Sequence, residues 1–220
     1  MAKQKKKIAL IIYTVIFYAI WAAFELVVKD ILNVTIKNEI LCQFVKSGII
    51  KNLVWTIPAI LLIRQFKSEV YITLKQMFTS KVNWQNYLPI FIIFTVYVLA
   101  GAILNNGKPD IVESFGADKV IIVLFVGLTE EMVFRGWLLN SSICEDKKWL
   151  YIIINAVMFL SIHFPNWICT GTFINNFMGL QFLEIIALSI VFSCTFLKSK
   201  NIFVPISLHM YYDLIVFMFI

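Results

Sequence analysis

Charge is scarce in this sequence, and histidine is scarcer still. Asp, Glu, Lys and Arg make up 15% of the 220 residues, against about 25% in an ordinary soluble domain, and only two histidines occur. So little charge excludes an ordinary water-soluble domain. The cations punctuate apolar runs and do not cluster, which also excludes a nucleic-acid-binding surface despite a net charge of +6.

Paired metal-binding and disulfide motifs are also lacking. The four cysteines form no CxxC pair, and no HExxH motif occurs. The spacing therefore predicts neither a disulfide framework nor a zinc ribbon. We interpret the cysteines as small apolar residues within or beside membrane spans.

Long apolar runs are what the sequence does contain. Hydrophobic residues make up 60% of the chain, and the mean hydropathy is +0.85. Only helices and closed barrels cross a bilayer, and the runs here are continuous where a barrel strand would alternate. At about 20 residues per span, the sequence predicts an all-α, polytopic transmembrane helical bundle with about seven spans, within a range of six to eight. We find no soluble domain, repeat or low-complexity tract.

The expected spans are 8–28, 48–63, 88–104, 120–143, 150–168, 173–197 and 202–220. The first run follows a cluster of lysines but has no small-residue cleavage site, so we interpret it as an uncleaved span and not a signal peptide. The amphipathic stretch 40–51 is expected to lie in the membrane interface.

The distribution of Lys and Arg predicts the orientation. With a cytoplasmic N-terminus, the inner segments carry about twice as many cations as the outer ones, in agreement with the positive-inside rule. We therefore expect a multi-pass protein of the cell membrane, in contact with the lipid bilayer. No nucleic-acid partner is expected, and the sequence does not specify an oligomeric state.

The fourth span contains Glu130, Glu131 and Arg135. On insertion scales, each charge near the middle of a span costs about 2.5–3.5 kcal/mol, so these groups must be paired, neutralised or in contact with a wet cavity. Glu131 and Arg135 are four residues apart and can form an ion pair on one helix face. Glu130 points about 100° away and is free to meet another helix as a general base. The alternative is that all three charges only hold helices together.

The two histidines change the balance between these interpretations. His163 lies within the fifth expected span, and His209 lies in the last span, four residues before Asp213. A single histidine in a span more often bonds helices together than catalyses a reaction. Two histidines, Glu130 and Asp213 on three spans instead predict one common polar site.

Such a cluster suits the hydrolysis of a peptide bond. Glu130 can take a proton from water, and His163 can orient that water or share the proton. His209 and Asp213 can stabilise the oxyanion, although Asp213 donates a hydrogen bond only when it is protonated; when ionised, it would orient His209. No serine or cysteine is placed as a nucleophile beside the histidines. These residue types also bind zinc, which stays an alternative, but we predict no cofactor.

Three motifs carry a family resemblance: Glu130-Glu131-x-x-x-Arg135, Phe159-x-x-x-His163 and His209-x-x-x-Asp213. They resemble the motifs of the CPBP intramembrane proteases, which include the CAAX prenyl endoproteases and the Abi-type bacteriocin-immunity proteins. All three occur in order, each on an expected span. The resemblance divides the chain into variable transmembrane segments, 1–118, and a CPBP-like catalytic core, 119–220.

The resemblance implies a hydrolase of the glutamate type, a class formerly described as metallo-endopeptidases. Glu130 and His163 would activate water, His209 and Asp213 would form the oxyanion site, and Glu131, Arg135 and Phe159 would support them. Asp213 replaces an Asn that is frequent in eukaryotic prenyl proteases, but the bacterial pattern accepts Asp.

The expected function is an intramembrane endopeptidase that acts on a membrane-associated peptide or protein; a prenylated substrate is not implied. The alternative is a non-enzymatic membrane protein of bacteriocin self-immunity. A proton-coupled transporter is disfavoured, because the first half of the chain does not repeat the motif-bearing half.

Overall fold

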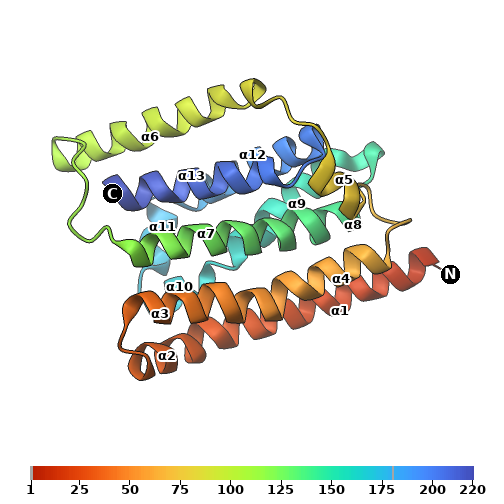
Figure 1. The fold of residues 1–220 in the computed structure, drawn as a ribbon, viewed down its shortest axis with the longest axis horizontal. Coiled ribbons are helices and arrows are strands. Elements are labelled where there is room, and N and C mark those ends of the chain that lie inside the picture. Colours follow the sequence, from red (N-terminus) through yellow and green to blue (C-terminus); the bar gives the residue numbers. More distant parts are fainter. Residues whose placement is uncertain (1, 180) are drawn as a thin grey trace.

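The computed structural model describes residues 2–179 and 181–220. Helices account for the secondary structure of these residues, and no strand occurs among them. Figure 1 shows long helices running side by side, with the N-terminus at one end of the bundle and the C-terminus at the other. The predicted all-α polytopic bundle is confirmed.

Two continuous helices form the N-terminal part of the bundle. The first consists of α1 (Ala2–Ala23), η1 (Phe24–Val28) and α2 (Lys29–Thr35). The second consists of α3 (Glu39–Gln43), η2 (Phe44–Ile50), η3 (Asn52–Thr56) and α4 (Ile57–Gln65). Segments η1, η2 and η3 are π-helical.

The expected interfacial position of residues 40–51 is wrong. These residues form the first half of a candidate span, Glu39–Gln65, and both Lys46 and Lys51 are buried. Asn38 begins this helix, because its side chain accepts a hydrogen bond from the backbone N–H of Leu41.

The rest of the bundle follows in sequence order. The short helix α5 (Leu74–Thr79) precedes α6 (Leu88–Asn106). The fourth long helix is α7 (Ala117–Glu131), continued by the π-helix η5 (Met132–Leu139) and by α8 (Asn140–Ser142). After it come α9 (Lys148–Ser161), α10 (Phe164–Cys169), α11 (Phe173–Met178), α12 (Gln181–Ser199) and α13 (Phe203–Phe219).

Within the described ranges, five helices are long and apolar enough to cross a membrane. Two further helices pack among them: α13, which is apolar but shorter, and α7 with η5, which carries the buried charges. These two helices correspond to the expected spans 120–143 and 202–220, which are not among the five.

The expected sixth span, 173–197, begins too early. Helix α11 ends at Met178, and the candidate span is α12, which begins at Gln181; Leu180 lies outside the described residues. Helix α11 instead packs against α10 through aromatic rings, those of Phe164, Trp167, Phe173 and Phe177. These contacts keep α11 at the end of the bundle away from the N-terminus (Figure 1).

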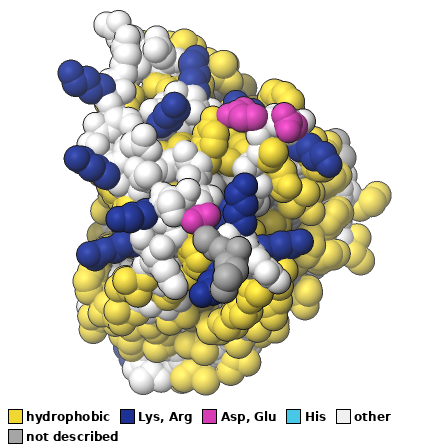
Figure 2. Space-filling view, turned by 90° about the vertical axis from the view of Figure 1, so that its right-hand side faces the viewer, with side chains coloured by type: hydrophobic (Ala, Val, Ile, Leu, Met, Phe, Trp, Pro, Cys, Tyr) yellow, Lys and Arg dark blue, Asp and Glu magenta, His cyan; other side chains and the backbone are white. Residues whose placement is uncertain are grey.

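Lysine and arginine side chains gather at the N-terminal end of the bundle (Figure 2). The start of α1, the connection from α4 to α6, the connection from α8 to α9 and the end of α12 meet at this end (Figure 1). These are the segments that the charge distribution assigns to the cytoplasmic side. The fold thus brings the expected inner cations to one face.

The core joins the N-terminal helices to the helix that carries the buried charges. Phe17 of α1 contacts Trp55 of η3 and Phe134 of η5, and Tyr13 contacts Trp137 of η5. All five rings are buried. The first two spans therefore pack directly on η5, one turn beyond Glu130 and Glu131.

Candidate active site

The site begins where α7 changes to the π-helix η5. Glu130 and Glu131 end α7, and Arg135 follows within η5. Arg135 Nη1 donates to Glu131 Oε1 at 2.9 Å, and both side chains are fully buried, so the predicted ion pair is present. Arg135 Nη2 also donates to the hydroxyl of Ser189 on α12, at 2.7 Å, and to its backbone carbonyl, at 3.0 Å. The guanidinium is therefore fixed between two helices.

A glycine sets the separation between α7 and α13. A Cβ atom on Gly127 would lie 2.7 Å from Cγ of Met210, well inside van der Waals contact. Gly127 lies one helical turn before Glu130 and Glu131, and Met210 follows His209. Only a residue without a side chain at 127 allows α13 to approach this closely, which brings His209 to the carboxylates.

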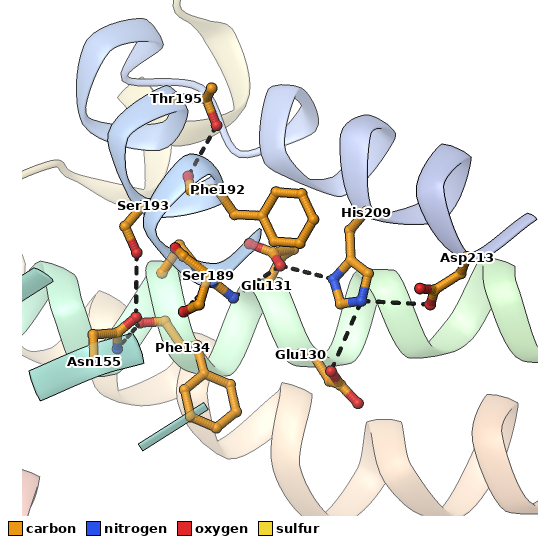
Figure 3. A network of polar contacts seen from close by, with 11 residues as sticks. Glu130, Glu131, Phe134, Asn155, Ser189, Phe192, Ser193, Thr195, His209 and Asp213 are labelled. Carbon is orange, nitrogen blue, oxygen red and sulfur yellow. Dashed lines mark hydrogen bonds and ion pairs between the residues drawn. The ribbon is translucent and has the colours of Figure 1, made fainter. Parts of the chain in front are cut away.

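His209 lies at the centre of the polar contacts (Figure 3). Its Nδ1 is 2.8 Å from Glu131 Oε1, and its Nε2 is 3.4 Å from Asp213 Oδ2 and 3.9 Å from Glu130 Oε2. The imidazole stacks on the ring of Phe192, with centroids 4.9 Å apart. Since Nδ1 is engaged by Glu131, Nε2 is the ring nitrogen that faces Glu130 and Asp213.

Phe159 connects the histidine of the fifth span to this cluster. Its ring lies 5.6 Å from the ring of His163 and 5.8 Å from that of His209, edge to face in both cases. The guanidinium of Arg135 lies 4.6 Å from the centre of the same ring. Phe159 thus packs against Arg135 and both imidazoles and connects the three side chains.

His163 lies at a turn between two helices. Helix α9 ends at Ser161, and His163 precedes α10, whose second residue is Pro165. Its backbone N–H donates to the carbonyl of Leu160 at 3.1 Å, a tighter turn than in an α-helix. Trp167 stacks on the imidazole, and Nε2 is buried without a hydrogen-bond partner in the described part of the chain. This nitrogen is free to bind a water or a substrate atom.

The structure brings three of the predicted residues into direct contact and places the fourth, His163, one side chain away. Glu130, His209 and Asp213 are in direct contact. His163 reaches them through Phe159, whose ring packs edge to face on both imidazoles. Any proton shared between Glu130 and His163 therefore passes through an intervening atom, which a water can supply.

Two charged residues near the site were not predicted as part of it. Glu25 in the first span and Lys51 in the second are both buried, and Lys51 Nζ lies 4.5 Å from the centre of the Trp21 ring, whose Nε1 donates to the carbonyl of Ile162 beside His163. Both lie inside expected spans, 8–28 and 48–63. The cost of an intramembrane charge, the argument that identified Glu130, would have found them as well.

The described residues contain no group of three or more His, Cys, Asp and Glu side chains that could hold a metal ion. At His209, Nδ1 contacts Glu131 and Nε2 faces two carboxylates, so both ring nitrogens already have protein partners. The cluster is therefore arranged as a network of hydrogen bonds and ion pairs.

Residues 114–215 match the family model described as "Type II CAAX prenyl endopeptidase Rce1-like". The matched stretch is just under half of the chain and contains all three motifs. No curated protein and no solved structure matches the chain.

Proposed function

We propose that Glu130 is the general base of a peptide-bond hydrolysis; the match of residues 114–215 to the type II CAAX prenyl endopeptidase model supports this proposal. The substrate in this proposal is a membrane-associated peptide or protein, because the site lies among helices that cross the bilayer. His163 acts together with Glu130, and His209 and Asp213 form the oxyanion site.

The proposed reaction consumes one water molecule for each peptide bond that is cleaved. Glu130 takes a proton from the water, and the resulting hydroxide attacks the carbonyl carbon of the substrate. His163 accepts or donates a hydrogen bond at this water through its unpartnered Nε2. When the C–N bond breaks, the protonated Glu130 returns its proton to the leaving nitrogen, so the enzyme is restored.

The oxyanion forms when the carbonyl is attacked. His209 Nε2 carries a donor hydrogen when the ring is an imidazolium, since Nδ1 contacts Glu131. Asp213 donates to the oxyanion when protonated, and otherwise it orients Nε2 across 3.4 Å. In this proposal Glu131 and Arg135 do not touch the substrate; they hold His209 and Phe159 in place.

One observation carries the proposal: a buried carboxylate on α7 lies 3.9 Å from a buried imidazole on α13, inside a membrane protein. Two such groups in the bilayer are costly unless the site is used. Their separation leaves space for the rearrangement of protons that hydrolysis requires, and a second histidine lies across the ring of Phe159.

The test is turnover of membrane-embedded model peptides by the purified protein in liposomes, compared with Glu130→Gln. We expect cleavage by the wild-type protein, a loss of at least about 100-fold in Glu130→Gln, and no loss with EDTA. Ser207→Ala, a substitution outside the contacts above, serves as a matched control. Equal cleavage by Glu130→Gln would overturn the proposal, and loss of cleavage with EDTA would replace the glutamate mechanism with a metal-dependent one.

Protection of cells against a bacteriocin distinguishes the peptidase from a non-enzymatic immunity protein. A binding protein does not need Glu130, so protection against a bacteriocin would survive a triple substitution of Glu130, His163 and His209. Loss of protection in the single variant Glu130→Gln, at unchanged protein level, favours the peptidase.

A further inference from the structure

A second group of charged side chains lies inside the first two spans, outside the three motifs. Glu25 belongs to η1, and Lys51 lies between η2 and η3; each is 8% exposed. Lys51 Nζ is 3.8 Å from Glu25 Oε1 and 4.5 Å from the centre of the Trp21 ring. A charge inside a span is costly unless it is paired or used, so both residues require an explanation.

The charge of Glu25 is already matched by another cation. Lys29 Nζ lies 2.9 Å from Glu25 Oε2 and also donates to Asn166 Oδ1 at 2.9 Å. The contact of Lys51 with Glu25 is longer than a hydrogen bond. With one carboxylate between two ammonium groups, Lys51 retains positive charge that Glu25 does not balance.

The helix geometry directs Lys51 toward the proposed site. Thr56 follows Lys51 by about one turn of the π-helix η3, so the two residues are neighbours along the second span. Thr56 Oγ1 lies 3.2 Å from Thr129 Oγ1, next to Glu130. In Figure 3 the second span passes on the side of α7 to which Glu130 points.

The proposed site has fewer cations than carboxylates. Three carboxylates, those of Glu130, Glu131 and Asp213, lie around His209, and Arg135 balances Glu131. Even a protonated His209 leaves one negative charge without a partner. In a membrane, such an imbalance disfavours the ionised carboxylate that a general base must have.

We propose that Lys51 is a positioning residue that supplies the missing positive charge to Glu130 and orients its carboxylate toward the water. It acts through Glu130 and does not touch the substrate; Glu25 and the face of Trp21 hold the ammonium in place. This inference rests on the proposed function of Glu130. It assigns part of the reaction to spans that carry no motif.

The first test compares Lys51→Met and Lys51→Arg with the wild-type protein and Glu130→Gln in the liposome assay. In Lys51→Met we expect kcat to fall about tenfold or more, with KM changed by less than about twofold, because a residue remote from the substrate alters only the chemical step. Lys51→Arg keeps the charge and restores most of kcat. Unchanged kcat in Lys51→Met, or a rise in KM alone, would overturn the inference.

The second test separates this role from a purely structural ion pair. Removal of Lys51 leaves Glu25 with one partner, so Lys51→Met can also destabilise the fold. Glu25→Gln/Lys51→Met removes both charges and leaves Lys29 with Asn166 as its remaining partner; kcat should stay as low as in Lys51→Met. Recovery of kcat in the double variant would show that pairing alone matters. Lys46→Met, on the same helix and also buried, removes an ammonium bonded to Asn33 and should retain kcat.

The outcomes distinguish the two proposals. If the wild-type protein does not cleave any peptide, the proposed function fails and the role of Lys51 fails with it. If the wild-type protein is active, Glu130→Gln is inactive and Lys51→Met is fully active, only the role of Lys51 fails.

Discussion

Glu131 holds His209 across the interface of α7 and α13, with Oε1 2.8 Å from Nδ1 of the imidazole. The same oxygen accepts a hydrogen bond from Arg135 at 2.9 Å. One carboxylate oxygen therefore orients the histidine that faces Glu130 and anchors the arginine that packs on Phe159. The second glutamate of the motif is the structural centre of the site, and this relationship leads to the first prediction.

Glu131→Gln should lower both activity and stability. The amide cannot compensate the charge of Arg135, and a buried charge left unpaired costs about 3–5 kcal/mol of folding free energy. We also expect kcat to fall about 100-fold, since His209 loses the partner that orients it. Thermal unfolding in detergent and turnover in liposomes measure the two effects.

Glu131→Gln/Arg135→Met is the control for this variant. With both charges removed, much of the lost stability should return, while His209 still lacks its anionic partner and activity stays low. Wild-type turnover in either variant would contradict the role given to Glu131.

Asp213→Asn tests how the last residue of the third motif acts. Asparagine is neutral and always carries an N–H donor. Activity of Asp213→Asn within about tenfold of wild type would therefore indicate that residue 213 donates a hydrogen bond to the oxyanion. Asp213→Leu, which is similar in size, should lose about 100-fold by the same argument. A loss in Asp213→Asn as large as that in Asp213→Leu would instead show that the negative charge is needed to orient His209.

Gly127→Ala should reduce activity by displacing α13. The new methyl group would meet Met210 Cγ at 2.7 Å, and a shift of about 1 Å in catalytic geometry can cost about 100-fold in rate. Gly101→Ala is the matched control, since its Cβ would lie 3.5 Å from Ile220 Cδ1, an ordinary contact. Equal turnover in the two alanine variants would refute the proposed effect of helix separation.

Asn155→Ala should destabilise the protein without changing the chemistry. Asn155 on α9 is buried, and its side-chain amide donates to the carbonyl of Phe134 in η5 at 3.0 Å (Figure 3). The loss of this side chain removes a hydrogen bond between buried groups, at a cost of about 0.5–1.5 kcal/mol, and takes away the partner of the Ser193 hydroxyl. The unfolding temperature should fall while kcat of the folded fraction stays unchanged; a change in kcat would place Asn155 in the reaction.

Local spacing predicted the contacts within one helix. Glu131 and Arg135, four residues apart, form the expected ion pair because the helical register fixes their separation. His209 and Asp213 share a face for the same reason. The hydropathy of the long runs likewise predicted the helical bundle, since the bilayer leaves few other structures for such segments.

The spacing of residues along the sequence could not predict the contacts between helices. The contact of Glu131 with His209 depends on how far α13 slides along α7, which close packing at Gly127 decides. The turn at His163 depends on Pro165 and on the stacking of Trp167, where a helical pattern predicted a continuous helix. The interfacial position expected for 40–51 was wrong because these residues belong to the candidate span Glu39–Gln65, one side of which packs on α7.

By itself, the sequence determined that the chain forms a helical membrane bundle. It also determined that Glu130, His163 and His209 lie on separate spans. Hydropathy and helical periodicity suffice for both, since each depends on neighbours within a few residues. Only the tertiary structure decided which groups touch: that Glu131 binds His209, and that Lys51 packs on Trp21 beside Glu25. Those contacts depend on side-chain packing between helices, which no spacing along one helix records.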